Sequence, residues 1–338
     1  MKVKRIGIDL AKQVFQVHGV DREERVVLKR QLRRSQMLAF FGKLEPSLIG
    51  MEACAGAHYW ARELMKLGHT VKLMAPQHVK PYVKGNKNDA NDAEAICEAV
   101  SRGSMRFVAV KTIAQQDLQA QHRVRTLLVR QRTAKANEIR GLLGEYGIIV
   151  GQRIDRLRRA LPVLLESPDH GFSDPLRLLL AGLQEDLVRL DERVKQLDGV
   201  IERAAREDAM ACRLQQIPGI GAITATALVA SVGDARQFRR ARDMAAWLGL
   251  VPRQHSSGGK DRLLGISKRG DAYLRTLLIH GARAVMRTAA RKTDPRSQWI
   301  GRVSQRRHPN IAAVALANKN ARIAWALMSR QTDYVAAV

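Results

Sequence analysis

Short apolar segments alternate with helical patterns over the first hundred residues. Runs rich in Val, Ile and Leu between polar turns predict strands, and apolar residues that recur every three or four positions predict helices. The predicted order is strand, strand, strand, helix, strand, helix, strand, helix, at residues 5–10, 14–20, 25–32, 35–44, 47–52, 57–67, 71–74 and 88–102. Ser35 is expected to cap the first helix. This order is the one expected of a ribonuclease-H-like sheet.

The middle of the chain reads as helical. Residues 115–146 contain no proline and predict a long helix, which a loop with Pro162, Pro168 and Pro175 follows. In the next helix apolar residues recur at spacings that alternate four and three, at Leu176, Leu180, Leu183, Leu187, Leu190, Val194, Leu197 and Ile201. This seam predicts a coiled coil, although a helix that packs on a core gives a similar pattern. The partner helix, either residues 115–146 or another chain, stays open.

The last third of the chain is helical again, strongly basic and interrupted by glycine-rich breaks. The predicted fold class is therefore α/β plus α, in three parts. These are a catalytic α/β domain at 1–112, a helical coiled-coil domain at 113–210 and a mainly helical domain at 211–338.

The charge balance narrows the function. Lys and Arg number 58 against 32 Asp and Glu, a net charge of +26. Because this surplus is spread over segments that are expected to fold, its natural partner is nucleic acid. No apolar run approaches the roughly 18 residues that span a bilayer, so no membrane partner is expected. Three widely spaced cysteines fit free thiols in a reducing cytoplasm better than disulfides or a zinc site.

Four carboxylates form the candidate metal site. Asp9 interrupts an apolar strand, Glu52 ends the strand expected beside it, and Asp89 and Asp92 share one face at a helix start. Carboxylate oxygens are ligands for Mg²⁺, with Mn²⁺ as the alternative, and two such ions can support phosphoryl transfer. The competing interpretation is that Asp89 and Asp92 only favour the helix N-terminus, and that Glu52 is an ordinary surface acid.

Two glycine-containing segments could contact DNA. Gly219 and Gly221 lie in a turn between helices and predict a helix-hairpin-helix that holds phosphates, or else a plain helix break. The loop around Ser256 and Ser257 is surrounded by basic candidates for phosphate contact, namely Arg253, His255, Lys260, Arg262, Lys268 and Arg269. A serine here could simply donate hydrogen bonds, or it could attack a phosphate while the cations offset the charge.

Several segments together resemble a known family. They are GIDLAK (7–12), MEA (51–53), NKNDANDA (86–93) and IPGIG (217–221), followed by GLVPRQHSSGGK (249–260) and GISKRG (265–270). In this order they resemble the DEDD transposases of insertion-sequence family 110, and the last two resemble its 1111 subgroup. The resemblance covers nearly the whole chain.

The resemblance implies more than the residues do by themselves. It implies a RuvC-like first domain, a coiled coil and a transposase domain, with Asp9, Glu52, Asp89 and Asp92 as the acids. Ser257 falls on the nucleophilic serine, with Ser256 as the alternative. The implied partners are double-stranded donor and target DNA, a structured noncoding guide RNA from the element, and further copies of the chain in a dimer or tetramer. A bacterial cytoplasmic enzyme that acts at the nucleoid is expected.

Three alternative functions are consistent with these sequence features. The first is an RNA-guided DNA recombinase in which a serine attacks the phosphate. The second is a RuvC-type junction-resolving endonuclease in which metal-activated water attacks, which leaves the basic last third unexplained. The third is a non-enzymatic DNA-binding scaffold, for which the acids would be dispensable.

Overall fold

The computed structural model describes residues 2–84 and 88–336, and the chain forms two compact units. Unit 1 comprises Met1–Gln115 and Val232–Asp243, and unit 2 comprises Gln116–Ser231 and Met244–Val338. Residues 86 and 87 of the NKNDANDA segment lie outside the described residues.

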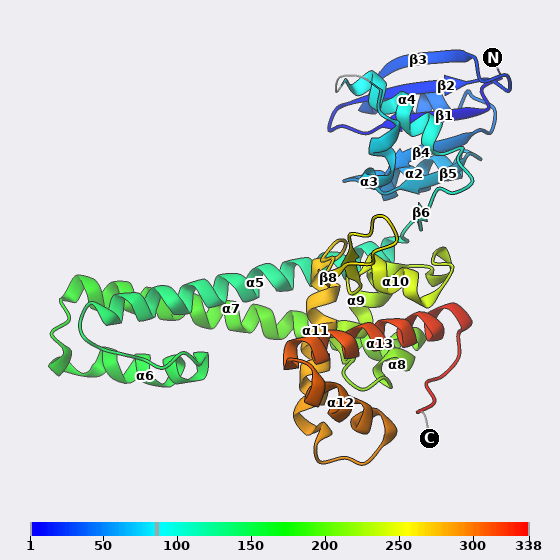
Figure 1. The fold of residues 1–338 in the computed structure, drawn as a ribbon. Helices are drawn as coiled ribbons and strands as arrows, with labels where there is room; N and C mark the ends of the chain where they lie inside the picture. The colour runs from blue at the N-terminus through cyan, green and yellow to red at the C-terminus, as the bar shows by residue number, and fades with distance from the viewer. Residues whose placement is uncertain (1, 85–87, 337–338) are drawn as a thin grey trace. The chain divides into compact units, whose positions relative to one another are not determined.

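A six-stranded mixed sheet forms the centre of unit 1 (Figure 1). Its strands are β1 (Arg5–Asp9), β2 (Val14–Val20), β3 (Val26–Arg33), β4 (Leu48–Glu52), β5 (Thr70–Met74) and β6 (Phe107–Val108). The order across the sheet is β3-β2-β1-β4-β5-β6, in which β1, β4 and β5 are parallel. The five predicted strands are confirmed, whereas the two-residue β6 was too short for a sequence pattern to reveal.

Helices cover both faces of this sheet. They are α1 (Met37–Phe41), α2 (Ala57–Lys66), α3 (Pro76–Val79) and α4 (Asp89–Ala99), with 3-10 turns η1 (Arg34–Gln36) and η2 (Lys80–Tyr82). Alternate residues of β1 face opposite sides, so Ile6 and Ile8 join the core with α1 and α2, while Gly7 faces α4. The predicted cap at Ser35 is wrong, because η1 begins at Arg34 and the Gln36 side chain accepts the Arg33 N–H (2.8 Å).

The later segment of unit 1 holds η4 (Ala235–Gln237). The Gln237 side chain accepts a hydrogen bond from the Ala109 N–H at 3.4 Å and donates one to the Val232 carbonyl at 2.6 Å. This segment therefore contacts Ala109, just after β6, although more than a hundred residues separate the two in sequence.

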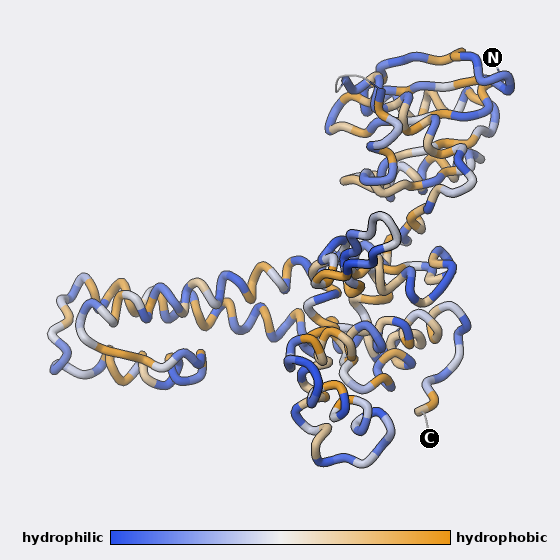
Figure 2. The backbone as a smooth tube through the Cα atoms, in the orientation of Figure 1, coloured by the Kyte–Doolittle hydropathy of each residue, from blue (hydrophilic) through white to orange (hydrophobic). Residues whose placement is uncertain are grey.

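In unit 2, the long helix α5 (Ile113–Gly144) lies beside α7 (Asp174–Glu207) and antiparallel to it (Figure 1). The first residues of α5, up to Gln115, belong to unit 1. Ion pairs Arg125–Asp198, Arg132–Asp191 and Lys135–Asp186 join them in reverse order along the chain. Figure 2 shows hydrophobic and hydrophilic positions alternating along both helices. Every position of the predicted heptad seam in α7 is buried or half-buried. The two helices thus pair within the chain, while supercoiling as a coiled coil stays a prediction.

The predicted loop with three prolines is wrong at Pro162, which lies inside α6 (Ile154–Glu166). A proline within a helix removes one backbone hydrogen bond. Here the buried Leu157 and Leu161 anchor the same helix in the core that α5, α6 and α7 share, which offsets that loss. Pro175, by contrast, sits in the first turn of α7, where its missing N–H costs nothing.

The remainder of unit 2 is a helical body with one hairpin. Its elements are α8 (Ala209–Gln215), α9 (Ala222–Val232), α10 (Ala241–Trp247), β7 (Pro252–Gln254), β8 (Leu263–Ile266), α11 (Ala272–Ala289), α12 (Pro295–Arg306) and α13 (Pro309–Arg330), with the boundary residues of α9 and α10 belonging to unit 1. Among the described residues, no helix is long and apolar enough to cross a membrane.

Candidate active site

Three of the four predicted acids meet at one edge of the unit 1 sheet. Asp9 is the last residue of β1, Asp89 is the first residue of α4, and Asp92 follows one turn later. One carboxylate oxygen from each lies within 4.8 Å of the others. Asp9 and Asp92 are half-buried and Asp89 is exposed. Hard oxygen donors at this spacing suit a divalent cation that keeps part of its water shell.

The fourth acid, Glu52, ends β4 beside them. Ile8 of β1 pairs with Met51 of β4, so the next residues, Asp9 and Glu52, end their strands at the same edge of the sheet. The 4.8 Å group does not include Glu52. Burial raises the pKa of its carboxyl, and the nearby charges of Asp9 and Asp92 raise it further. A cation bound among these groups would relieve that repulsion, so the donor set fits a divalent metal.

The start of α4 does not need the two aspartates as caps. Asn88 precedes the helix, and its side-chain oxygen accepts the Ala90 N–H at 3.0 Å. Asp89 and Asp92 therefore have carboxylates available for a ligand, and the helix N-terminus additionally favours their negative charge. This arrangement weakens the interpretation that Asp89 and Asp92 serve only to stabilise the N-terminus of α4.

Gly7 determines how closely α4 approaches the sheet. A Cβ atom at this position would lie 2.2 Å from the Ala93 carbonyl oxygen and 2.4 Å from the Cys97 nitrogen. Gly50 of β4 has a similar role, since a Cβ there would lie 2.8 Å from Cβ of Val100. Neither glycine was predicted as a functional residue from the sequence. The available signal was a glycine between two large apolar residues in a buried strand, which indicates a close approach of backbone.

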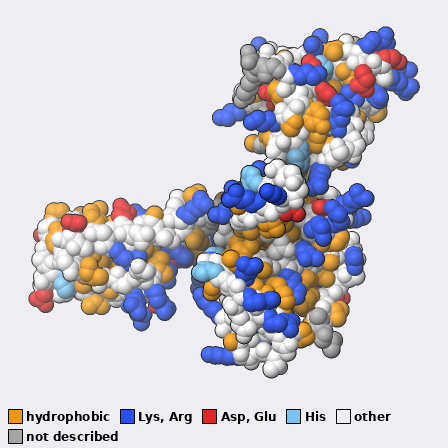
Figure 3. All heavy atoms as spheres, viewed as in Figure 1, with side chains coloured by type: hydrophobic (Ala, Val, Ile, Leu, Met, Phe, Trp, Pro, Cys, Tyr) orange, Lys and Arg blue, Asp and Glu red, His pale blue; other side chains and the backbone are white. Residues whose placement is uncertain are grey.

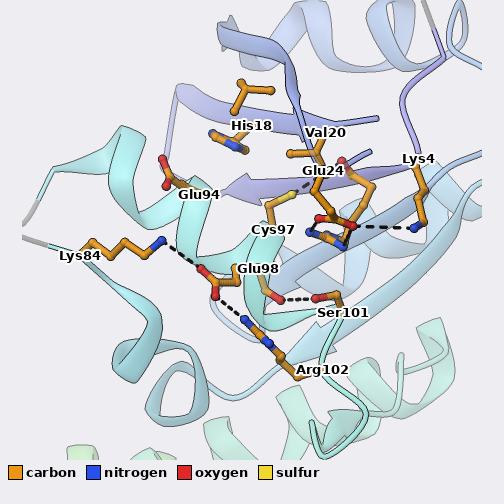
Figure 4. Close-up of a pocket in the computed structure, with 12 residues that line it drawn as sticks. Lys4, His18, Val20, Glu24, Lys84, Glu94, Cys97, Glu98, Ser101 and Arg102 are labelled. Carbon is orange, nitrogen blue, oxygen red and sulfur yellow. Dashed lines mark hydrogen bonds and ion pairs between the residues drawn. The ribbon is translucent and has the colours of Figure 1, made fainter. Parts of the chain in front are cut away.

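A cavity of about 650 Å³ lies beside the C-terminal half of α4 and is lined by residues of α4, β1 and β2 (Figure 4). Arg5, on the buried face of β1, pairs with Glu24, while Cys97 of α4 donates to the Arg5 carbonyl at 3.7 Å. Glu98 of α4 pairs with Arg102 and with Lys84 (3.5 Å). The acids and bases of this cavity largely neutralise one another. The contact between Cys97 and the Arg5 carbonyl joins α4 to β1 at this cavity.

In unit 2, the candidate serine lies at the tip of the β7–β8 hairpin. The Lys260 N–H donates to the Ser257 carbonyl at 3.0 Å, which closes a turn through Gly258 and Gly259. Both glycines have positive φ (56° and 76°), a conformation that L-residues rarely adopt. The backbone thus presents Ser257 on an exposed, tight turn.

The two adjacent serines differ in their side-chain contacts. The Ser256 hydroxyl donates to Asp261 Oδ1 at 2.8 Å and accepts from Gln254 Nε2, also at 2.8 Å. For Ser257, by contrast, no side-chain hydrogen bond is found within residues 2–84 and 88–336. An attacking hydroxyl must be free to approach phosphorus, so the geometry favours Ser257 over Ser256.

The predicted basic contacts surround this hairpin, and all are exposed: Arg253, His255, Lys260, Arg262, Lys268 and Arg269. Figure 3 shows Lys and Arg side chains spread over the visible faces of both units. This distribution fits an extended polyanion better than a single small anionic ligand.

The predicted glycine turn lies between α8 and α9. Gly219 has φ +93°, and a Cβ atom there would lie 2.8 Å from the Gly281 carbonyl oxygen in α11. Gly219 therefore allows a close contact between backbones, while Gly221 is exposed at the start of α9. Of the two glycines, only Gly221 has open space beside it for a phosphate.

The parallel strand ends and the helix-borne aspartates of unit 1 fit the RuvC-like class of DNA-processing domains. A model of the family DEDD_Tnp_IS110, described as "Transposase", matches residues 6–148. A second, described as "Transposase IS116/IS110/IS902 family", matches residues 211–298.

Full-length relatives agree with these matches. The chain is 59% identical to a "Probable family 20 transposase" of Pseudomonas aeruginosa, over 99% of both chains. It is 48% identical to the "Transposase for insertion sequence element IS1111A" of Coxiella burnetii, over 98% of this chain and 91% of the relative. It is 42% identical to the IS1328 transposase of Yersinia enterocolitica, over 98% of both. The chain belongs to the IS110/IS1111 family and is a DNA transposase.

Proposed function

We propose that this transposase cuts and rejoins DNA with Ser257 as the nucleophile and with Asp9, Glu52, Asp89 and Asp92 as ligands of Mg²⁺ or Mn²⁺. The observation that carries the proposal is the group of carboxylates at the sheet edge, with oxygens of Asp9, Asp89 and Asp92 within 4.8 Å. A bound divalent cation would neutralise charge on the scissile phosphate and stabilise the leaving oxygen. The DEDD family is itself consistent with use of a divalent metal.

The chemical step is a transesterification. The Ser257 oxygen forms a bond to phosphorus as the bond between phosphorus and the 3′ oxygen breaks, and the hydroxyl proton leaves to solvent. The 3′ oxygen takes up a proton and departs as a free hydroxyl, which leaves a 5′-phosphoserine link to the DNA. Attack by a 3′ hydroxyl on that link reverses the step, so strands rejoin without an external energy source.

The surrounding cations contribute to binding. Arg253, Lys260 and Arg262 are exposed around the hairpin tip and would offset the charge on the reacting phosphate. Lys268 and Arg269, with His255 and the turn at Gly219 and Gly221, would hold the DNA backbone without reading sequence. Target choice would then come from an element-encoded noncoding RNA, and the acids and the serine would meet in a dimer or tetramer.

Covalent trapping tests the nucleophile. DNA labelled on the 3′ side of the scissile phosphate, in the fragment that stays linked to the protein, is incubated with the protein and Mg²⁺, and adducts are resolved on a denaturing gel. Ser257→Ala should abolish adducts and recombination, whereas Ser256→Ala should retain adducts. Asp9→Asn should lose cleavage while it keeps DNA binding. Free 5′-phosphate ends and normal cleavage in Ser257→Ala would instead point to attack by water, as in a junction-resolving endonuclease.

The guide RNA has its own test. The protein is purified from cells that carry the whole insertion element, and the nucleic acid that remains bound is sequenced. A discrete structured RNA from the element is expected. Recovery of only random cellular RNA would contradict this part of the proposal and leave the serine mechanism intact.

A further inference from the structure

A second cavity in unit 1, of about 580 Å³, lies at the sheet edge where β1 ends and β2 begins. This volume is within the range of small-molecule sites, roughly 300–1,000 Å³. The residues that matter for its chemistry are Gln13, Arg33, Arg34, Tyr59 and Trp60. They come from the β1–β2 turn, the end of β3 with η1, and the start of α2.

The floor of this cavity is a fixed aromatic group. Trp60 is 4% exposed and packs edge-on against Phe15 (5.3 Å between ring centroids) and Tyr59 (5.1 Å). Its indole nitrogen has no hydrogen-bond partner among the described residues. Tyr59, in contrast, keeps 41% of its surface exposed. The result is an exposed tyrosine ring in T-shaped contact with a buried tryptophan, whose indole N–H lacks an acceptor among the described residues.

Arginines provide the rest of the wall. The Arg34 guanidinium lies over the Trp60 ring at 5.1 Å, and Arg33 beside it is exposed. Within the described part of the chain, neither arginine pairs with a carboxylate. Arg30 repeats the arrangement further along β3, over Phe40 at 5.6 Å. Arginines and aromatic rings in one groove are the combination that binds single-stranded nucleic acid.

One residue that lines the cavity, Gln13, is close in sequence to Asp9 of the carboxylate group. Gln13 follows Asp9 by four residues, so their Cα atoms are at most about 14 Å apart. That distance corresponds to roughly four base steps of a DNA strand. Asp9 and Gly7 face α4, whereas Trp60 belongs to the core on the opposite side of the sheet. A strand that leaves the acids would therefore turn around the sheet edge to reach the cavity.

We propose that this cavity binds one unpaired DNA nucleotide a few positions from the scissile phosphate, with the base stacked on Tyr59 and the backbone phosphate held by Arg33 and Arg34. The inference rests on the proposed function, since it assumes that DNA passes the carboxylates. The base is unpaired because a base inside a duplex has both faces occupied by its neighbours. One stacking site of this kind is compatible with a protein in which aromatic residues make up only 4% of the chain. The site anchors a strand that has been opened at the point of cleavage.

Photocrosslinking tests the assignment directly. The full-length Asp9→Asn protein is irradiated with a single-stranded DNA oligonucleotide that carries 5-iododeoxyuridine, and crosslinked peptides are mapped by mass spectrometry. A crosslink at Tyr59 is expected with the single strand and not with the matched duplex. Crosslinks only at other residues would overturn the proposal. A crosslink to an RNA of the same sequence, without one to the DNA, would also overturn it.

Matched variants supply a second readout through equilibrium binding of the same single strand. Tyr59→Ala should weaken binding about tenfold, and Tyr59→Phe, which keeps the ring, should bind like the wild type. Arg22→Ala removes an exposed cation from the β2–β3 turn at the other end of these strands, and should change binding less than about twofold. Equal binding by Tyr59→Ala and Tyr59→Phe would refute the stacking contact.

The two proposals can fail separately. Wild-type protein that crosslinks at Tyr59 but never cleaves DNA would contradict the proposed function and leave the nucleotide site standing. Protein that forms serine adducts normally in Tyr59→Ala, with unchanged single-strand binding, would contradict the site and leave the proposed function standing.

Discussion

Replacing Gly7 with alanine should displace the aspartates of α4 from Asp9. The added Cβ atom would lie 2.2 Å from the Ala93 carbonyl oxygen, whereas ordinary contact begins at 3.4 Å. The helix must therefore shift by about 1.2 Å, or the strand must deform by as much. Overpacking of this kind costs about 1–3 kcal/mol. A misplacement of about 1 Å among catalytic groups can reduce the rate roughly a hundredfold.

Hydrogen exchange and cleavage together measure this effect. A cost of about 1–3 kcal/mol that falls on α4 lowers the free energy of local unfolding of this helix by the same amount. Its amides should then exchange roughly 5- to 150-fold faster in Gly7→Ala than in the wild type. Metal-dependent DNA cleavage should fall by about two orders of magnitude. Gly103→Ala is the matched control in the same unit, because a Cβ at Gly103 would meet nothing within 4 Å.

Two results would refute the reasoning. Wild-type exchange throughout α4 in Gly7→Ala would mean that the close approach at Gly7 does not set the position of the helix. Faster exchange with unimpaired cleavage would mean that the position of α4 does not control the carboxylates.

The other predictions concern charge. Asp92→Asn should stabilise the metal-free protein, because one charge leaves a group whose oxygens lie within 4.8 Å, and should remove the rise in melting temperature that Mg²⁺ causes in the wild type. Glu52→Gln should also stabilise the metal-free protein near neutral pH. Because the folded state raises the pKa of Glu52, this advantage should vanish as the pH falls below 4.5, the ordinary value, and a pH-independent difference in urea unfolding would contradict it. Burial lowers the pKa of His122 to about 4, so stability should fall as the pH drops from 6.5 toward 4; His122→Gln should flatten that loss, and an unchanged pH profile would count against it.

The strands of unit 1 could be predicted from sequence because their signals are local. Alternating apolar residues and polar turns indicate each strand, and the parallel pairing of β1 with β4 then brings Asp9 and Glu52 to one edge. The distance of α4 from the sheet could not be predicted in this way. It depends on the contact between Gly7 and Ala93, which are far apart in the chain and share no local pattern.

Other outcomes depended on tertiary contacts. The heptad seam left the partner of α7 open, and pairs such as Arg125–Asp198 and Lys135–Asp186 select α5 of the same chain. The contact between Ser256 and Asp261, which distinguishes the two serines, likewise follows from the register of the hairpin. The three-part domain division, the nucleophile and the nucleic-acid contacts stay predictions.

Residues 232–243 of unit 1 are synthesised well after the rest of the unit. Residues 232–243 leave the ribosome about 130 residues after Gln115, which is roughly 6 to 26 s later at 5–20 residues per second. Until then Ala109 lacks its Gln237 partner, so the unit that carries the carboxylates is incomplete. A chain that ends before residue 232 therefore carries the four acids in a unit that lacks its last segment.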